Sequence, residues 1–397
     1  MLEDTLKDVR ILDITQNVAG PFATQILGDL GAEVIKLERP GTGDDIREWR
    51  PPEIGGQSAT FLGLNRNKSS ICVDIGTPAG QEVARDLART VDVVIHSMKP
   101  GSAEQRRLGY DDLSALNPAL VYCAISAFGQ TGPLKNLPGY DPLMQAFTGI
   151  ISATGNEGDD PVRVGVSLVD MGTGMWGALG VLSALMQRAR TGTGTLVEAS
   201  LMDTGIAWMT IFVAGFGATG KVPRKLGSAT AITAPYELFR SADGHVFIAA
   251  GNDRLFARVC HALGCVELLE DERFATNPQR VINRVALREA IEVCTRTRAT
   301  AQVVDALRRA GAPCSELNTV ADVLAHEQVR AADIIKPLAV ENAPGHRVVA
   351  LPIKSGGRRS ARLSAPPALG ADTDRILTEL GYEPDKLAAL HADGVVA

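Results

Sequence analysis

One acidic residue, Asp170, stands in the segment GVSLVDMGTGMWGALGVLSAL, residues 165–185, which is otherwise apolar and rich in glycine. The residues that follow it, 171–190, have the pattern of a helix. An aspartate at the start of a helix is most often a cap, because it accepts hydrogen bonds from free backbone N–H groups. The same place suits a reactive carboxylate, which can attack an activated carbonyl and form a mixed anhydride. Asp170 is therefore either a cap or a nucleophile.

Three basic residues, Arg39, Lys68 and Lys99, lie near the ends or starts of predicted strands. Parallel sheets bind ligands at the carboxyl ends of their strands, and a guanidinium there can hold a phosphate through two bonds. Each residue taken alone has the features of an ordinary surface charge. Together they favour an anionic small molecule as ligand.

The first 130 residues alternate between β-branched, strand-like segments and helix-like segments. We predict strands over residues 9–15, 32–38, 69–75, 91–98 and 119–126, and helices over 20–31 and 77–90. Pro21 suits a first helical position, and Thr77 and Pro78 suit the cap and the first residue of the second helix. This alternation predicts an α/β fold with a doubly wound, Rossmann-like parallel sheet.

The second half of the chain has a different pattern. Residues 213–235 are rich in Gly, Thr and Ala and are predicted as a long connection. Residues 236–251 predict a hairpin around Asp243-Gly244, and amphipathic helices are predicted over 253–264, 283–296 and 300–311. These elements predict a smaller α+β domain. Two short helices are predicted within 366–396.

Composition excludes several classes of protein. The net charge of −6 gives no reason to expect nucleic acid or an anionic membrane as partner. No uncharged apolar run has membrane-spanning length, and the N-terminal residues do not predict a secretion signal. The six cysteines form no C-x-x-C pair and no cluster with the histidines, so we expect reduced thiols, no metal site and a cytoplasmic location. The loop TQNVAGPF lacks both G-x-G-x-x-G and the P-loop lysine.

Over nearly its full length the chain resembles the family III coenzyme A transferases. The resemblance is carried by the segments AGPFATQILGDLGAEVIKLERPGTGDD (19–45), LNRNKSSICVDI (64–75), ISAFGQTGP (125–133), PGYD (138–141), VSLVDMGTGMWGALGVLSAL (166–185), TGTGTLVEASLMD (191–203), APYELFRSADG (234–244) and PPALGADTDRILTELGY (366–382). It implies a large domain built from residues 1–215 and 335–397, a small domain at 225–330, and a homodimer of two interlocked, ring-shaped chains.

The family's catalytic aspartate lies in the stretch matched by SLVDMGTG, so the resemblance makes Asp170 the nucleophile. It implies that CoA moves from an acyl-CoA donor to a carboxylic acid through an aspartyl anhydride and an aspartyl-CoA thioester. The CoA thioester is then a substrate, and neither a tightly bound cofactor nor a metal is needed.

The resemblance also implies contacts with CoA, carried over position by position. The matching residues are Val18, Ala19, Arg39, Val73, Gly76, Ser97, Met98, Lys99, Gln105, Arg106, Tyr140 and Asp141. The family's usual Asn-Phe-Arg-Pro-Gly is Ser97-Met98-Lys99-Pro100-Gly101 here. Basic residues that are usual in the family are replaced by Gln105, which has Arg106 beside it, and by Leu137.

Three activities remain open on the sequence alone. An α-methylacyl-CoA racemase of the same fold pairs the aspartate with a histidine where this chain has Tyr140, which favours a transferase. A CoA-binding protein without catalysis is disfavoured by the intact Asp170.

Residues 41–70 look closest to family members that use succinyl-CoA and small dicarboxylic acids, although acyl-carnitine or aromatic-acid transfer stays open. The cation for a second carboxylate would be Arg47, Arg66 or Arg163.

Overall fold

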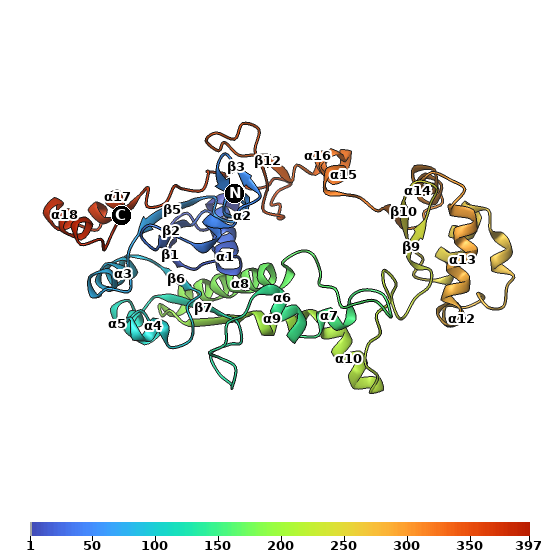
Figure 1. Cartoon of the computed structure of the whole chain (residues 1–397), viewed down its shortest axis with the longest axis horizontal. Coiled ribbons are helices and arrows are strands. Elements are labelled where there is room, and N and C mark those ends of the chain that lie inside the picture. Colours follow the sequence, from blue (N-terminus) through green and yellow to red (C-terminus); the bar gives the residue numbers. More distant parts are fainter. Residues whose placement is uncertain (1) are drawn as a thin grey trace. The chain divides into compact units, whose positions relative to one another are not determined.

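The computed structural model describes residues 2–397, which form two compact units (Figure 1). Unit 1 contains the chain up to Ile150, together with Arg163–Ala214 and Arg330–Ala397. Unit 2 contains Ile151–Val162 and Gly215–Val329. The boundaries expected from the sequence assign residues 151–162 to the large domain, whereas the structure groups this segment with unit 2.

Unit 1 is built on a six-stranded sheet in the order β5-β2-β1-β6-β7-β8, in which every pair of neighbours is parallel. Its strands are β1 (Arg10–Ile14), β2 (Glu33–Glu38), β5 (Lys68–Cys72), β6 (Val93–His96), β7 (Val121–Ser126) and β8 (Leu196–Ser200). The five predicted strands are confirmed, and β8 was not predicted. The chain order runs outward from β1 to β5 and then outward again from β6 to β8, so the direction reverses between β1 and β6.

Alternate residues of the strands enter two hydrophobic cores, one on each face of the sheet. On β1, Ile11 packs in one core and Leu12 in the other. Helices α1 (Ala19–Asp29), α6 (Asp141–Phe147), α8 (Leu168–Thr191) and α9 (Leu201–Trp208) cover the Ile11 face. Helices α3 (Pro78–Thr90), α5 (Tyr110–Leu116), α17 (Thr373–Glu379) and α18 (Pro384–Ala392) cover the other face. The two predicted C-terminal helices are confirmed and pack on the N-terminal sheet.

The glycines of α8 allow this helix to approach α1 closely. A Cβ added to Gly174 would lie 2.5 Å from the carbonyl oxygen of Ala19, which is the first residue of α1. A Cβ on Gly172 would meet Trp208 at 2.8 Å. The glycine-rich sequence around Asp170 is therefore required by packing at the start of α8.

The remaining elements of unit 1 are short. They are η1 (Leu2–Asp4), η2 (Asp45–Glu48), α2 (Ala59–Leu64), α4 (Ser102–Gln105), and the antiparallel pairs β3 (Glu53–Ile54) with β4 (Gln57–Ser58) and β12 (Ile335–Pro337) with β13 (Arg347–Val349). Three helices each contain a boundary between the two units along the chain, namely α7 (Ile150–Ala153), α10 (Thr210–Thr219) and α16 (Glu327–Ala332). Because α10 continues to Thr219, the expectation of an irregular connection from residue 213 is wrong for its first residues.

Unit 2 contains a three-stranded antiparallel sheet in the order β11-β10-β9. The strands β9 (Tyr236–Arg240) and β10 (His245–Ala249) form the predicted hairpin, and β11 is Cys314–Glu316. The helices α11 (Asp253–Leu263), α13 (Arg284–Thr295) and α14 (Thr300–Arg309) pack on this sheet around one core and confirm the three predicted amphipathic helices. The shorter elements are η3 (Val266–Leu269), α12 (Asn277–Ile282) and α15 (Val320–Ala325).

Candidate active site

A cavity of about 110 Å³ lies at the carboxyl ends of the strands, where the strand order reverses between β1 and β6. Its wall is formed by the loop after β1, by residues following β6, β7 and β8, and by the starts of α6 and α8. The residues that line it are Gln16, Asn17, Val18, Ala19, Gly20, Trp49, Ser97, Ile125, Ser126, Ala127, Gly139, Tyr140, Asp170 and Leu201. Open α/β sheets bind their ligands at this place, because the neighbouring loops diverge there.

Asp170 is not the residue that caps α8. Its position is the third of the helix, and the N-cap residue Ser167 makes no side-chain capping bond. The capping oxygen is Oδ2 of Asp141, which accepts hydrogen bonds from the backbone N–H groups of Val169 at 2.7 Å and Asp170 at 3.2 Å. Asp141 is buried at the start of α6. The carboxylate of Asp170 is thereby left to line the cavity.

The surroundings of Asp170 favour its protonated form more than water does. Burial, and then the charge of Asp141, raise the pKa of Asp170 from 3.8 to about 7. A carboxyl group with this pKa is substantially ionised near neutral pH and is a stronger base than an ordinary aspartate. Such a group is suited to act as a nucleophile, and perturbed groups of this kind are concentrated at functional sites.

Buried charges hold the loop that forms one wall of the cavity. The Nζ of Lys36 donates to the carbonyl of Thr15 at 2.9 Å and pairs with Asp44 at 2.8 Å. Asp44 Oδ1 accepts from the N–H of Asn17 at 3.0 Å, and Asn17 has a left-handed backbone with φ of 66°. These contacts fix the direction in which the chain turns from β1 into α1.

Lys68 belongs to the same buried network. Its Nζ lies 3.1 Å from Asp13 Oδ2 and 2.8 Å from Asn65 Oδ1, and its side chain is fully buried. The interpretation of Lys68 as a cation for an anionic ligand is therefore wrong, because its donors are used inside the protein.

A second support lies at the end of β6. The buried His96 accepts a hydrogen bond at Nδ1 from the N–H of Met98 at 3.1 Å, and burial lowers the pKa of this histidine to about 4. Its ring therefore remains neutral and keeps its acceptor. Ser97 Oγ accepts from the N–H of Gln16 at 3.0 Å, which joins the loops after β1 and β6 across the reversal point.

Four predicted CoA contacts line the same cavity as Asp170. These are Val18, Ala19, Ser97 and Tyr140, of which Tyr140 is 55% exposed. Asp141 is not among the lining residues, since it is buried and its two oxygens are occupied by Gln145 and α8.

The other predicted contacts follow strand ends at the same edge of the sheet. Arg39 follows β2 and is paired with Asp45, while Val73 and Gly76 follow β5. Val73 is fully buried and bridges to Val396.

After β6, Met98 packs against the core, Lys99 and Gln105 are exposed, and Arg106 donates to Ser102. These positions agree with a ligand extended along the strand ends, and their contacts with CoA stay predictions.

The three candidate cations for a second carboxylate differ in their partners. Arg47 is paired with Glu38 at 2.6 Å and stacks on Phe61. The buried Arg66 is paired with Asp29 at 2.5 Å. Within residues 2–397 Arg163 has no ion pair, and it contacts only the carbonyls of Val164 and Gly165. Only Arg163 is left with its charge uncompensated.

Four further residues line the site without having been expected from the sequence, namely Gln16, Asn17, Trp49 and Ser126. Gln16 and Asn17 precede Val18 in the loop after β1, so their positions could have indicated them. Trp49 has no local signal, because η2 and the cis Arg50-Pro51 bond that flank it do not follow from a pattern. Within the described residues no three His, Cys, Asp or Glu side chains are placed to hold a metal ion.

The fold and the cavity define an α/β protein with a ligand site at the reversal point of a parallel sheet and a basic carboxylate inside it. The chain belongs to CoA-transferase family III, whose family model matches residues 6–373. It is 37% identical over 395 residues to the succinyl-CoA:glutarate CoA-transferase of Mus musculus, a match that covers 98% of this chain and 90% of that protein. It is therefore an enzyme, a CoA-transferase.

Further relatives and a solved structure agree with this assignment. The succinate–glutarate CoA-transferase of Agrobacterium fabrum is 35% identical, over 94% of this chain and 95% of that protein. The succinyl-CoA–D-citramalate CoA-transferase of Chloroflexus aurantiacus is 35% identical, over 98% of each chain. The crystal structure of a CAIB/BAIF family protein from Brucella suis superposes with a TM-score of 0.84 and 37% identity, and the match covers 94% of this chain and 98% of that chain.

Proposed function

We propose that this enzyme moves CoA from succinyl-CoA to a small dicarboxylic acid, with Asp170 as the covalent nucleophile. The observation that carries the proposal is that the carboxylate of Asp170 lines the cavity while Asp141 caps α8 in its place. A carboxylate that merely capped the helix would have its oxygens on the backbone N–H groups. This difference supports a role for the Asp170 carboxylate in chemistry on a bound thioester.

The proposed reaction has four steps. An oxygen of Asp170 attacks the donor thioester carbonyl, the C–S bond breaks, and CoA leaves as the thiolate. The thiolate attacks the aspartyl carbonyl of the anhydride, which releases the donor acid and leaves an aspartyl-CoA thioester. The acceptor carboxylate attacks this thioester and displaces CoA again. The thiolate then attacks the acceptor carbonyl of the second anhydride, forming the product thioester and regenerating the Asp170 carboxylate.

The neighbours of Asp170 do not favour the alternative, an α-methylacyl-CoA racemase. Racemisation needs a second base on the opposite face of the α-carbon. Tyr140 lines the cavity, and the carboxylate of Asp141 is already engaged by α8 and Gln145. A phenol hydroxyl is a weaker base than the histidine imidazole that the racemases have at this position.

The acceptor class is inferred from the relatives and from Arg163. The relatives named above are called transferases of glutarate and citramalate, which are dicarboxylic acids. A second carboxylate requires an uncompensated cation, because a carboxylate cannot displace the buried partners of Arg47 and Arg66 without leaving a charge unpaired. We therefore assign the recognition of the distal carboxylate to Arg163.

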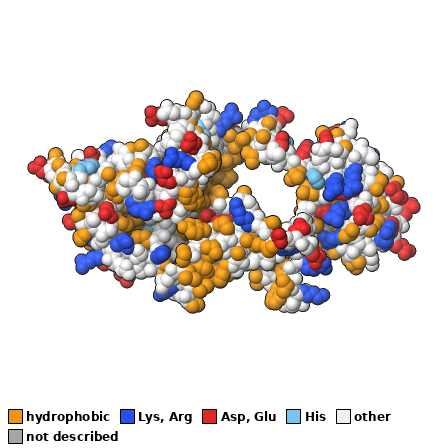
Figure 2. Space-filling view, viewed as in Figure 1, with side chains coloured by type: hydrophobic (Ala, Val, Ile, Leu, Met, Phe, Trp, Pro, Cys, Tyr) orange, Lys and Arg blue, Asp and Glu red, His pale blue; other side chains and the backbone are white. Residues whose placement is uncertain are grey.

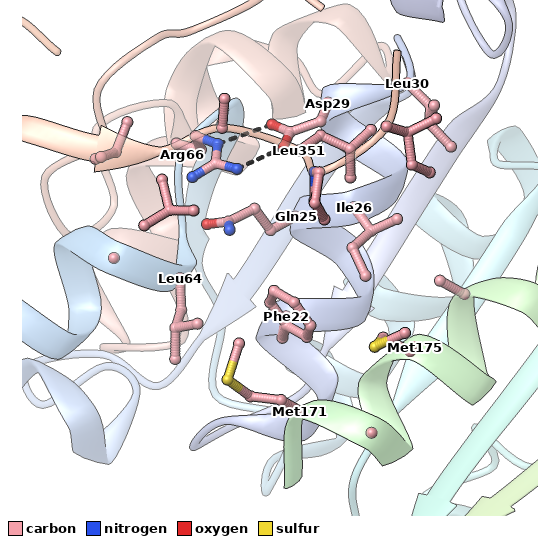
Figure 3. A pocket seen from close by; sticks show the side chains of 18 of the residues that line it. Phe22, Gln25, Ile26, Asp29, Leu30, Leu64, Arg66, Met171, Met175 and Leu351 are labelled. Carbon is pink, nitrogen blue, oxygen red and sulfur yellow. Dashed lines mark hydrogen bonds and ion pairs between the residues drawn. The ribbon is translucent and has the colours of Figure 1, made fainter. Parts of the chain in front are cut away.

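We also propose that the enzyme is a homodimer, in which a second copy covers an apolar groove of unit 1. The groove has a volume of about 730 Å³ and lies between α1, α2, α8 and the residues following β13 (Figure 3). Met175, Trp176 and Leu179 are each 44–53% exposed along it. Figure 2 shows hydrophobic side chains gathered over the lower part of unit 1. Exposed apolar surface of this extent is typical of an interface.

The groove also contains a buried polar atom without a hydrogen-bond partner in the described residues. Oε1 of the buried Gln25 has no hydrogen-bond partner within the part of the chain that the structure describes. Its side chain lies among the groove residues near Leu64 and Arg66 (Figure 3). An unpaired buried acceptor costs about 1–3 kcal/mol. Interlocking of the two chains is part of the same proposal.

We further propose that the enzyme is cytoplasmic and has no membrane anchor. All six cysteines are free thiols, which agrees with a reducing compartment. The helix α8 is long and apolar enough to cross a membrane, as is the bent pair of α9 and α10. Half of the apolar stretch of α8 is buried inside the protein, against α1 and the sheet. We therefore interpret α8 as a core helix.

The proposal is tested by trapping the acyl-enzyme. The protein is incubated with succinyl-CoA and then with hydroxylamine, which converts an aspartyl anhydride or thioester to a hydroxamate. A hydroxamate at residue 170 in the native protein, absent in Asp170→Asn, supports the proposal. A modification elsewhere, or none while CoA transfer proceeds, contradicts it.

A further inference from the structure

Gln145 uses its whole side-chain amide to join α6 to the segment that leads into α8. It lies one helical turn after Asp141 and is fully buried. Its Nε2 donates to Asp141 Oδ1 at 2.5 Å and to the carbonyl of Val164 at 3.3 Å. Its Oε1 accepts from the N–H of Val164 at 2.9 Å. One side chain therefore satisfies both backbone groups of Val164 and one oxygen of Asp141.

These contacts fix both ends of the segment 164–170. Val164 is held by Gln145, and the N–H groups of Val169 and Asp170 are held by Asp141, which is itself held by Gln145. The residues between them, Gly165, Val166 and Ser167, are exposed or half-buried and belong to no regular element. The direction in which Asp170 enters the cavity thus depends on this short chain of hydrogen bonds.

We infer that Gln145 is a positioning residue for the covalent step, and that it acts on Asp170 through the carboxylate of Asp141. With Gln145 present, Asp141 can rotate only by losing the bond at Oδ1, so Oδ2 stays directed at the first turn of α8. Without it, Asp141 and the backbone of Val164 have unpaired groups in a buried place, and the segment 164–170 must move to reach water. The inference rests on the proposed nucleophilic role of Asp170.

A positioning role predicts an effect on rate that a simple loss of stability does not. Displacement of a reacting group by about 1 Å can lower the rate of a chemical step about 100-fold. We expect the strand-end loops to bind the acyl-CoA, whereas the hydrogen bonds of Gln145 go to Asp141 and Val164. The expected signature is therefore a fall in kcat with a nearly unchanged KM for the acyl-CoA.

The test compares Gln145→Met with Asn117→Leu in the full chain. Asn117 also joins two backbone segments through its side-chain amide, donating to Val91 O at 3.0 Å and accepting from Ala119 N at 3.2 Å. It lies before β7, at the opposite end of the sheet from the cavity. Both variants lose the same kind of bridge, so both should lower the thermal midpoint.

We expect Gln145→Met to lower kcat and the rate of hydroxamate formation at residue 170 by about 10- to 100-fold. The Asn117→Leu variant should retain the native kcat. Equal kcat values in the two variants, per folded molecule by circular dichroism, overturn the inference. If Gln145→Met does not fold, Gln145→Glu keeps the shape but loses the Nε2 donor, and native kcat in that variant equally overturns it.

The two proposals fail in different ways. If the native protein transfers CoA without any hydroxamate at residue 170, the nucleophilic role of Asp170 is wrong whatever Gln145 does. If the native protein forms the hydroxamate and Gln145→Met forms it at the same rate, only the positioning role is wrong.

Discussion

Oδ2 of Asp141 lies 3.2 Å from the backbone nitrogen of Asp170, so one aspartate caps the helix that carries the other. The two carboxylates are 29 positions apart in the sequence, and they differ in their hydrogen-bond partners. The buried Asp141 is stabilised by backbone N–H groups and by Gln145. Within residues 2–397 the carboxylate of Asp170 accepts no such hydrogen bonds, and its pKa is raised to about 7 by burial and by the charge of Asp141.

The ionised form of Asp170 should cost the enzyme stability. Its pKa in the folded protein is about 7, against 3.8 for the free group, so the folded state holds its proton more tightly. Its contribution to the free energy of unfolding is therefore fully present below about pH 4 and is lost as the pH rises through 7. We expect Asp170→Asn to be inactive and about 4 kcal/mol more stable than the native protein at pH 8, because each pKa unit corresponds to about 1.4 kcal/mol.

The measurement is chemical denaturation at several pH values. The difference between Asp170→Asn and the native protein should approach zero near pH 4 and reach its full size above pH 7. An Asn variant that is less stable than the native protein at pH 8 would show that the carboxylate has a structural role.

The rate of acylation should follow the ionisation of Asp170. A carboxylate attacks a thioester only when it is deprotonated, so the rate of the first half-reaction should rise with pH through a midpoint near 7. In Asp141→Asn the like charge is removed, and the midpoint should move to lower pH by up to about one pH unit. Single-turnover release of CoA over pH 5–9 measures both midpoints.

This pH shift separates electrostatics from misplacement. If the maximum rate of Asp141→Asn falls while its midpoint stays where it is in the native protein, Asp141 acts only as a cap. A midpoint that moves to higher pH contradicts the assignment of the raised pKa to the neighbouring charge.

Arg163 should control the choice of acceptor. Replacing the uncompensated guanidinium in Arg163→Gln should raise KM for a dicarboxylic acceptor about 10-fold or more, because a charged hydrogen bond contributes about 1.5–3 kcal/mol. The half-reaction with succinyl-CoA should be weakened as well, because the succinyl group also has a free carboxylate, whereas the KM for a monocarboxylic acceptor should show little change. Steady-state kinetics with glutarate and butyrate measure the difference.

Arg66→Met serves as the comparison for that experiment. Arg66 is buried against Asp29, so its loss leaves an uncompensated carboxylate and should destabilise the fold by about 3–5 kcal/mol. Its effect should appear in the thermal midpoint and not in the ratio between dicarboxylic and monocarboxylic acceptors. If Arg163→Gln leaves this ratio unchanged, the second carboxylate is bound elsewhere.

The apolar groove should be covered in solution. The side chain of Trp176 lines the groove and is 44% exposed. Its replacement by aspartate places a charge in the groove and leaves the core of the monomer intact. We expect Trp176→Asp to weaken or abolish the dimer in analytical ultracentrifugation. The matched control is Ile282→Asp on α12, where an isoleucine that is 75% exposed lies outside the groove. A native protein that sediments as a monomer contradicts the dimer.

The sheet and the helices of unit 1 followed from local patterns, because strands buried on both faces read as continuous apolar runs. Thr77 caps α3 through the N–H of Gly80, as the sequence predicts. The strand β8 was missed because four of its five residues are exposed or half-buried, so it lacks the continuous apolar run of the other strands. Pro21 lies at the third position of α1, since Ala19 begins the helix.

The hydrogen-bond and ion-pair partners of the charged residues could not be predicted from local patterns. The cap of α8 comes from Asp141, and the partner of Arg66 is Asp29, 37 positions away. Such pairs depend on how elements pack, and a single sequence carries no local sign of them. The position of Asp170 within a glycine-rich helix start was recognisable, whereas the residue that frees its carboxylate was not.

The most direct test of the account follows an oxygen atom. The enzyme is allowed one turnover with succinyl-CoA and an acceptor acid that carries ¹⁸O in its carboxyl groups. The mass of the peptide that contains residue 170 is then measured by mass spectrometry. The proposed steps return one acceptor oxygen to Asp170, so the peptide should gain one ¹⁸O while the released succinate remains unlabelled. An unlabelled Asp170 together with ¹⁸O in the succinate of the first turnover would mean direct attack of the acceptor on succinyl-CoA, and would contradict the role of Asp170.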